Sequence, residues 1–168
     1  MANVMLLIDD GFEVAEVLYP YYRMQEAGYA VSVVGPGPGI YHSKHGYPFE
    51  ADKSPSEVRA EDFKAIIIPG GYAPDKMRTK PRMVELLREG IEKGLLIGSI
   101  CHGAQMLIEA GALKGKKATC YVSVKTDIMN AGAMYVDTSV VTDGRLVTSR
   151  HPGDLPDFCR TLLEMLAK

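Results

Sequence analysis

Cysteine is scarce in this 168-residue sequence, and its spacing excludes two kinds of protein. The three cysteines, Cys101, Cys120 and Cys159, form neither an even set nor a C-x-x-C pair. An odd number of widely separated thiols argues against a disulfide scaffold and against a cysteine-ligated zinc site. We therefore expect three reduced thiols and no metal centre.

The sequence also lacks a long hydrophobic run, an excess of charge of one sign and a phosphate-binding loop. In "MANVMLLIDDGFE" acids end the apolar stretch too early for a signal-peptide core or a membrane span. With 19 basic and 21 acidic residues the formal charge is −2, which gives no field that favours nucleic acid or an anionic membrane. The glycines of "GPGPG" (35–39) match neither G-x-G-x-x-G nor G-K-[ST]. We expect a cytoplasmic protein without a cofactor and without nucleic acid or a membrane as partner.

The composition is that of a folded domain. Apolar residues make up 46% of the chain and charged residues 24%, which is ordinary for a globular protein. A chain of this length suits one substantial hydrophobic core better than two small ones. We expect a single domain over residues 1–168.

Short apolar runs separated by helix-like stretches predict the fold class. Their continuous apolarity favours strands buried on both faces, and intervening helices favour parallel crossover connections. We expect an α/β fold: a three-layer α/β/α sandwich with a mainly parallel, flavodoxin-like sheet. The runs are "VMLLI" (4–8), "YAVSVV" (29–34), "AIIIP" (65–69) and "LLIGSI" (95–100).

Helical periodicity and turn residues predict the remaining elements. Helices are expected near 13–27, 81–94, 102–113 and 155–167, with Pro20 either bending the first helix or marking its first turn. "IYHSKHGYPFEAD" predicts a short antiparallel excursion after "GPGPG". Asp143-Gly144, between two apolar runs, predicts a hairpin.

Cys101 has the context of a nucleophile. "IGSICHGAQML" places it between a buried strand and a helix, which matches the strand-nucleophile-helix elbow of hydrolases with Cys in place of Ser. Backbone amides at the start of that helix would stabilise a thiolate, and Gly103 permits close backbone approach. We expect the pKa of this thiol to lie below its usual value of roughly 8.5. Cys120 and Cys159 lack this context, so we assign them to the core.

The residues alone do not identify which groups act on the thiol. His102 could move its proton, but it would need an orienting carboxylate or carbonyl that spacing does not identify. Glu13 follows the first strand, at the sheet edge where ligand sites gather. Its position suits two roles equally: a protonated carboxyl near the thiol, or an acid at the N-terminus of a helix. "PGGYAPD" (69–75) offers glycine amides for an oxyanion and Asp75 as an orienting acid, or is an ordinary turn.

The other histidines do not indicate a metal site. His42 and His45 lie in the predicted excursion without matched acid or cysteine ligands nearby, so we expect them to be solvated. His151 precedes a predicted helix start, and we expect a structural role for it.

The combination of motifs resembles the PfpI family of intracellular proteases and protein deglycases, within the class I glutamine amidotransferase-like superfamily. The resemblance covers essentially the whole chain. It rests on "FE" after the first strand, "KHGY", "PGGYAPD", "ICHG", "NAG", "VTDGRLVTSR" and the pattern SR-P-DLP-F before the last helix.

This resemblance implies roles for the candidate residues. Cys101 is the implied nucleophile, Glu13 the carboxyl that hydrogen-bonds its thiol, and Asp75 the acid that completes a triad with His102. In family members that acid can come from a neighbouring subunit, which implies a homo-oligomer, a dimer or trimer of dimers, with a shared site. Gly70, Gly71 and the His102 backbone are the implied oxyanion donors.

The expected function is that of a cytoplasmic cysteine hydrolase of the stress-response kind. The leading substrates implied by the resemblance are glyoxal or methylglyoxal adducts on amino groups. An intracellular peptidase and a glyoxalase acting on methylglyoxal remain alternatives, because all three begin with thiolate addition at the same site. A non-enzymatic redox sensor or chaperone, in which Cys101 is oxidised to a sulfinic acid, is the alternative from another class.

Overall fold

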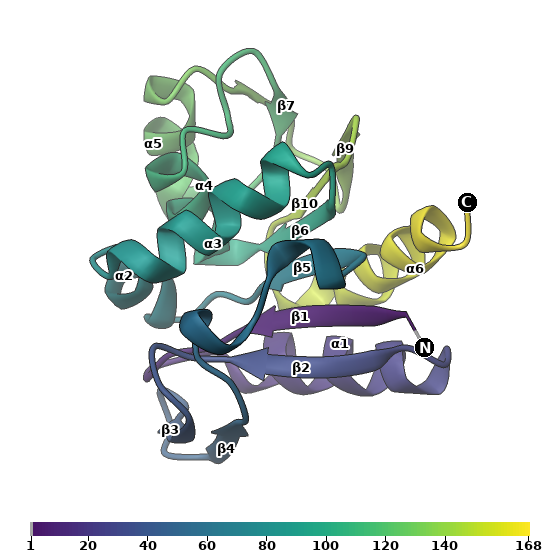
Figure 1. Ribbon diagram of the computed structural model, residues 1–168. Helices are drawn as coiled ribbons and strands as arrows, with labels where there is room; N and C mark the ends of the chain where they lie inside the picture. The colour runs from purple at the N-terminus through teal and green to yellow at the C-terminus, as the bar shows by residue number, and fades with distance from the viewer. Residues whose placement is uncertain (1) are drawn as a thin grey trace.

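The computed structural model describes residues 2–168 of the chain, so residue 1 of the predicted domain lies outside the described part. The chain alternates strands and helices through most of its length (Figure 1). The strands are β1 (Asn3–Leu7), β2 (Ala30–Val34), β3 (Gly39–His42), β4 (Pro48–Ala51), β5 (Ala65–Ile68), β6 (Leu96–Ile100), β7 (Lys117–Ala118), β8 (Met134–Tyr135), β9 (Val141–Asp143) and β10 (Leu146–Ser149). The α-helices are α1 (Val14–Glu26), α2 (Ala73–Met77), α3 (Pro81–Glu92), α4 (Ala104–Glu109), α5 (Lys125–Asn130) and α6 (Leu155–Leu166).

The main sheet is parallel except at one edge. Its strand order is β2-β1-β5-β6-β10-β9, and only β9 runs antiparallel to its neighbour. Every residue of β5 and β6 is buried, because these central strands are covered on both faces. The predicted α/β fold with a mainly parallel sheet is confirmed.

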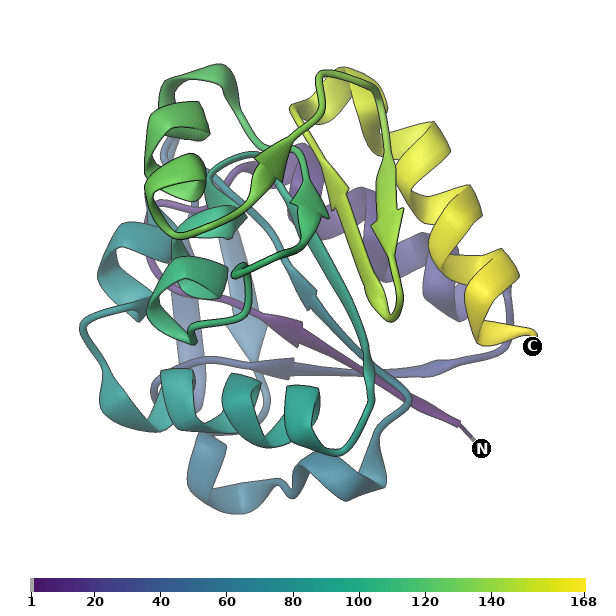
Figure 2. The same cartoon turned by 90° about the horizontal axis from the view of Figure 1, so that it is seen from above.

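Helices cover both faces of this sheet. Figures 1 and 2 show α1 and α6 together on one face, with α3 and α4 on the other. Small residues allow close packing: a Cβ at Gly98 of β6 would lie 2.9 Å from Leu162 of α6, and one at Gly90 of α3 would lie 2.4 Å from Ile66 of β5. Three layers result.

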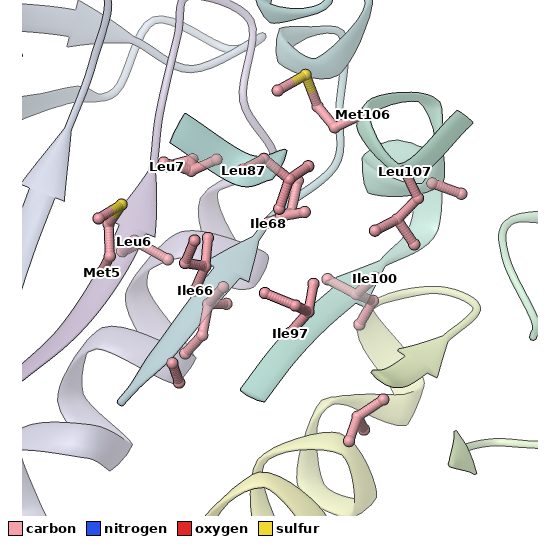
Figure 3. Close-up of a cluster of buried hydrophobic side chains, with 14 of the residues drawn as sticks. Met5, Leu6, Leu7, Ile66, Ile68, Leu87, Ile97, Ile100, Met106 and Leu107 are labelled. Carbon is pink, nitrogen blue, oxygen red and sulfur yellow. The ribbon is translucent and has the colours of Figure 1, made fainter. Parts of the chain in front are cut away.

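The core lies between β1, β5 and β6 and the helices above them. Figure 3 shows Leu6, Ile66, Ile68, Ile97 and Leu107 gathered there from three strands and α4. Each fully buried aliphatic side chain of this size contributes about 1.5–3 kcal/mol relative to exposure. This core fixes the sheet whose carboxyl edge carries the site.

The irregular parts largely follow the turn signals. β3 and β4 form the expected antiparallel hairpin, and β9 and β10 pair across the Asp143-Gly144 turn. Pro20 lies inside α1, which begins at Val14, so it does not mark the first turn. Among the helices of residues 2–168, none has the length and apolarity that crossing a membrane requires.

Candidate active site

Cys101 sits on a strained elbow at the carboxyl end of β6. The strand ends at Ile100, Cys101 begins a 3₁₀ turn that ends at Gly103, and α4 follows. Its φ is 61°, the one positive value of a non-glycine residue in the described part of the chain. A side chain in this region costs backbone energy, which the surrounding packing must offset. A Cβ at Gly103 would lie 2.5 Å from the carbonyl oxygen of Ile68, so glycine is required for the turn to lie against β5. The predicted elbow is confirmed.

His102 contacts the thiol directly. Its Nδ1 lies 3.3 Å from the Sγ of Cys101, and its Nε2 lies 3.2 Å from the Oγ of Ser123. The ring stacks on Tyr121 with 4.9 Å between centroids and 27° between planes. Burial, aided by the positive charge of Lys44, lowers the pKa of His102. The imidazole is therefore neutral at neutral pH and has a lone pair available for a proton.

The carboxyl beside the thiol belongs to Glu16 and not to Glu13. Glu16 is fully buried, and its Oε1 accepts a hydrogen bond from the Gly70 backbone N–H at 2.8 Å. Its Oε2 has no hydrogen-bond partner among residues 2–168. Burial raises the pKa of Glu16 to about 8, and the charge of Glu13 adds to this rise. Glu16 thus carries a proton at neutral pH next to Cys101.

Glu13 occupies a different position, which corrects the expected contact with the thiol. It immediately precedes α1, and its Oε2 lies 2.6 Å from the Nζ of Lys44. The start of the helix explains the difference: Glu16 lies in the first turn of α1 on the buried face that also carries Val17 and Pro20, whereas Glu13 precedes the helix in extended backbone. This ion pair raises the pKa of Lys44.

The pKa of the thiol is raised, contrary to the expected decrease. Burial raises the pKa of Cys101 to about 12, and the negative charge of Glu16 adds to the effect when that group ionises. Backbone N–H groups of His102 and Gly71 act in the opposite direction. Cys101 is only 7% exposed, and α4 has six residues, so desolvation outweighs the helix terminus. A thiolate at this position would require proton transfer to a base, and the Nδ1 of His102 lies 3.3 Å from the sulfur.

The structure also places two further candidate groups. The Gly70 N–H is bonded to Glu16 and is not free to hold an oxyanion, whereas the Gly71 and His102 N–H groups act to lower the pKa of the Cys101 thiol. Asp75 lies exposed on α2 and is not among the residues that line the pocket within residues 2–168. Within one chain, Ser123 and not Asp75 contacts the distal nitrogen of His102.

The site opens into a pocket of about 350 Å³ with charges on its wall. Lys44 Nζ also lies 5.8 Å from the centre of the Tyr72 ring at the mouth. The pocket is lined by Glu13, Glu16, Lys44, Gly71, Tyr72, Cys101, His102, Tyr121 and Pro152. The two other cysteines are fully buried, as expected, and His42 and His45 are exposed. Over residues 2–168 no group of three or more His, Cys, Asp or Glu side chains is placed to hold a metal ion.

Sequence reasoning missed Glu16, Lys44, Tyr121 and Ser123. Glu16 left a signal: it is an acid on the apolar face of a helix, where an unpaired carboxyl is costly. Ser123 and Tyr121 left none, because they reach His102 from a 3₁₀ turn distant in sequence.

Comparison with known proteins agrees with the fold. The DJ-1/PfpI family model matches residues 2–165. A relative from Pyrococcus furiosus named "Deglycase PfpI" is 40% identical over 164 residues, which cover 98% of this chain and 99% of the relative. "Putative cysteine protease YraA" from Bacillus subtilis is 41% identical over 165 residues, 98% of each chain.

A solved structure is also closely similar. It is a two-domain protein of Anabaena variabilis with DJ-1/ThiJ/PfpI-like and ferritin-like domains, 41% identical with a TM-score of 0.97. The match covers 99% of this chain and 48% of that one, so this chain spans about half of that protein. The chain belongs to the DJ-1/PfpI family.

Proposed function

We propose that this protein is a cysteine hydrolase that removes glyoxal or methylglyoxal adducts from amino groups, with Cys101 as nucleophile. The observation that carries the proposal is the 3.3 Å contact between Cys101 Sγ and His102 Nδ1 on a strained elbow in an open pocket. Relatives named as deglycases at about 40% identity support the choice of substrate. The cytoplasm, where thiols stay reduced, is the setting that this chemistry suits.

The first step joins the sulfur to an electrophilic carbon. His102 Nδ1 takes the thiol proton, the sulfur lone pair forms the S–C bond at the adduct carbon that carries the amine, and the C–N bond breaks with its electron pair going to nitrogen. The Gly71 and His102 N–H groups at the sulfur are placed to stabilise charge that develops next to it. His102 then gives its proton to the departing amine nitrogen.

Protonated Glu16 assists the same step. A carboxylate there would repel the thiolate, whereas a neutral carboxyl adds no negative charge beside Cys101. Glu13 and Lys44 provide one charge of each sign at the pocket wall, which suits substrates that carry both amino and carboxyl groups.

The later steps distinguish the candidate reactions. To release lactate from a methylglyoxal adduct, the sulfur-bound carbons must first isomerise from a hydroxyketone, S–CH(OH)–CO–CH₃, to a hydroxyacyl thioester, S–CO–CH(OH)–CH₃, and water then cleaves the S–C bond. A peptidase needs no such rearrangement, since water attacks an acyl-enzyme directly. The peptidase is the second candidate because of the relative named as a putative cysteine protease.

We also propose that the protein acts as a homo-oligomer in which Asp75 serves a neighbouring subunit. Asp75 is exposed on α2 and does not line the pocket of its own chain as described. A role for it at His102 therefore requires a second copy. Mixing Cys101→Ser with Asp75→Ala subunits should restore activity in part. No recovery despite subunit exchange shown by native mass spectrometry would overturn the shared site.

Turnover on purified substrates tests the function. Wild type and Cys101→Ser are compared on methylglyoxal, on N-acetyl-lysine adducts freed of unbound aldehyde, and on unfolded peptides. We expect wild type to release many equivalents of hydroxy acid and free amine per subunit, and Cys101→Ser to release none above background. Cleaved peptides alone would favour the peptidase, and turnover of free methylglyoxal alone the glyoxalase. At most one oxidised thiol per subunit, without product, would favour the redox sensor.

A further inference from the structure

Ser123 is the polar side chain that meets the far nitrogen of His102. Its Oγ lies 3.2 Å from Nε2 and makes no other side-chain hydrogen bond within residues 2–168. It belongs to the 3₁₀ turn Val122–Val124, directly after Tyr121, whose ring stacks on the imidazole. One short segment therefore holds both the face and the distal edge of the ring.

The hydrogen on the imidazole decides what His102 can do. With the hydrogen on Nε2, the lone pair on Nδ1 faces the sulfur and can accept its proton. With the hydrogen on Nδ1, the ring can donate to a thiolate but cannot take the thiol proton. A serine hydroxyl can accept from Nε2–H or donate to a bare Nε2, so the contact alone allows both forms.

The surroundings of the sulfur favour the first form. Burial raises the pKa of Cys101, so the thiol keeps its proton at neutral pH. Nδ1 of His102 lies 3.3 Å from Sγ, and it can accept this S–H when its lone pair faces the sulfur. The ring hydrogen consequently lies on Nε2 and points at Ser123.

We propose that Ser123 is a positioning residue: its hydroxyl oxygen accepts the Nε2–H of His102, fixes the tautomer that takes the Cys101 proton and stabilises the resulting imidazolium. This inference rests on the proposed role of Cys101 as nucleophile, but it concerns the formation of the thiolate and no particular substrate. The Nε2–H···Oγ bond becomes charge-assisted once Nδ1 is protonated, and such bonds are stronger than neutral ones. Ser123 thus favours the imidazolium–thiolate pair over the neutral pair.

The contact is accessible to water, which limits its effect. Ser123 is exposed, so a water molecule can replace the hydroxyl in part when it is removed. We expect Ser123→Ala to slow the alkylation of Cys101 at neutral pH by roughly three- to tenfold, in line with a hydrogen bond of modest net strength. Ser123→Thr keeps the hydroxyl and should stay within about twofold of wild type.

Two measurements test the proposal. Long-range ¹H–¹⁵N NMR of the histidine rings reports the tautomer of His102 in the wild-type protein. The His102 signals are identified as those that disappear in His102→Asn. Iodoacetamide rates across pH, read from the Cys101 peptide by mass spectrometry, report thiolate formation without any substrate. Ser56→Ala is the matched control, since Ser56 is an exposed serine in another 3₁₀ turn, Pro55–Glu57.

The expected result is an Nε2–H tautomer in wild type, and in Ser123→Ala a mixture of tautomers with slower alkylation. Ser123→Thr and Ser56→Ala should resemble wild type. Because Asp75 of a second copy would reach the same Nε2, the Ser123→Ala effect should be at least as large in an Asp75→Ala background, where that acceptor is also removed. An Nδ1–H tautomer in wild type, or an unchanged alkylation profile in Ser123→Ala, would overturn the proposal. If the alkylation rates change as expected but no substrate is turned over, the proposed function alone would be refuted.

Discussion

Replacing Glu16 by Gln should change how the stability of the protein depends on pH. The folded state holds this carboxyl fully buried, and burial raises its pKa from 4.5 to about 8. Between these values the unfolded chain loses the proton and the folded chain keeps it. Wild type therefore loses stability as pH rises from about 4.5 to about 8, because the unfolded state binds fewer protons there.

The size of the effect follows from the pKa difference. At about 1.4 kcal/mol per pH unit, the total is about 5 kcal/mol, of which about 3 kcal/mol has been lost at pH 7. Gln cannot ionise, and its amide oxygen can still accept the Gly70 N–H. Relative to wild type, Glu16→Gln should therefore gain stability steadily as pH rises through this window.

Urea unfolding of both proteins at several pH values between about 5 and 8 measures the difference. Other titrating groups largely cancel in the comparison. Glu13→Gln is the control, since it removes a nearby carboxylate but leaves Glu16 to titrate, so most of the wild-type slope should persist. A difference between wild type and Glu16→Gln that stays constant across this range would refute a protonated, buried Glu16.

Three further predictions concern packing, reactivity and the ion pair at the end of β1. A Cβ at Gly71, where φ is +82°, would lie 2.5 Å from backbone atoms, so Gly71→Ala should lower the free energy of unfolding by about 2 kcal/mol or more. Gly37 has open space around it, so Gly37→Ala should change this free energy little. Urea titrations of both variants measure the difference. Mass spectrometry after brief iodoacetamide treatment should find Cys101 modified before the two other cysteines, which are fully buried; earlier modification of either would contradict the elbow assignment. Lys80→Ala leaves the buried carboxylate of Asp9 without its ion-pair partner, so the free energy of unfolding should fall by about 2 kcal/mol, as measured by thermal unfolding. An unchanged melting temperature would show that this pair contributes nothing to stability.

The fold could be predicted from the sequence because local patterns and tertiary structure agree. β5 and β6 read as continuous apolar runs since both faces are covered, and the Asp143-Gly144 turn carries its own hairpin signal. The elbow at Cys101 was predictable for the same reason: a strand, a small turn and a helix follow one another in the chain.

The contacts of the site could be predicted only in part, because they depend on where α1 begins and on segments distant in sequence. Glu13 precedes α1 and pairs with Lys44, whereas Glu16 lies inside the helix beside the thiol, and position after β1 suits either. Ser123 reaches His102 across 21 residues. The raised pKa of Cys101 was missed because burial of the sulfur is a tertiary property, whereas the helix start is a local one.

The most direct test of the central claim is product counting with wild type and Cys101→Ser. Each protein is incubated with a purified methylglyoxal adduct of N-acetyl-lysine, with unbound methylglyoxal removed beforehand and trapped during the reaction, and lactate and free N-acetyl-lysine are counted by NMR. We expect equal amounts of both products, many per wild-type subunit, and none above background with Cys101→Ser. Equal product formation by the two proteins, or none by either, would contradict it.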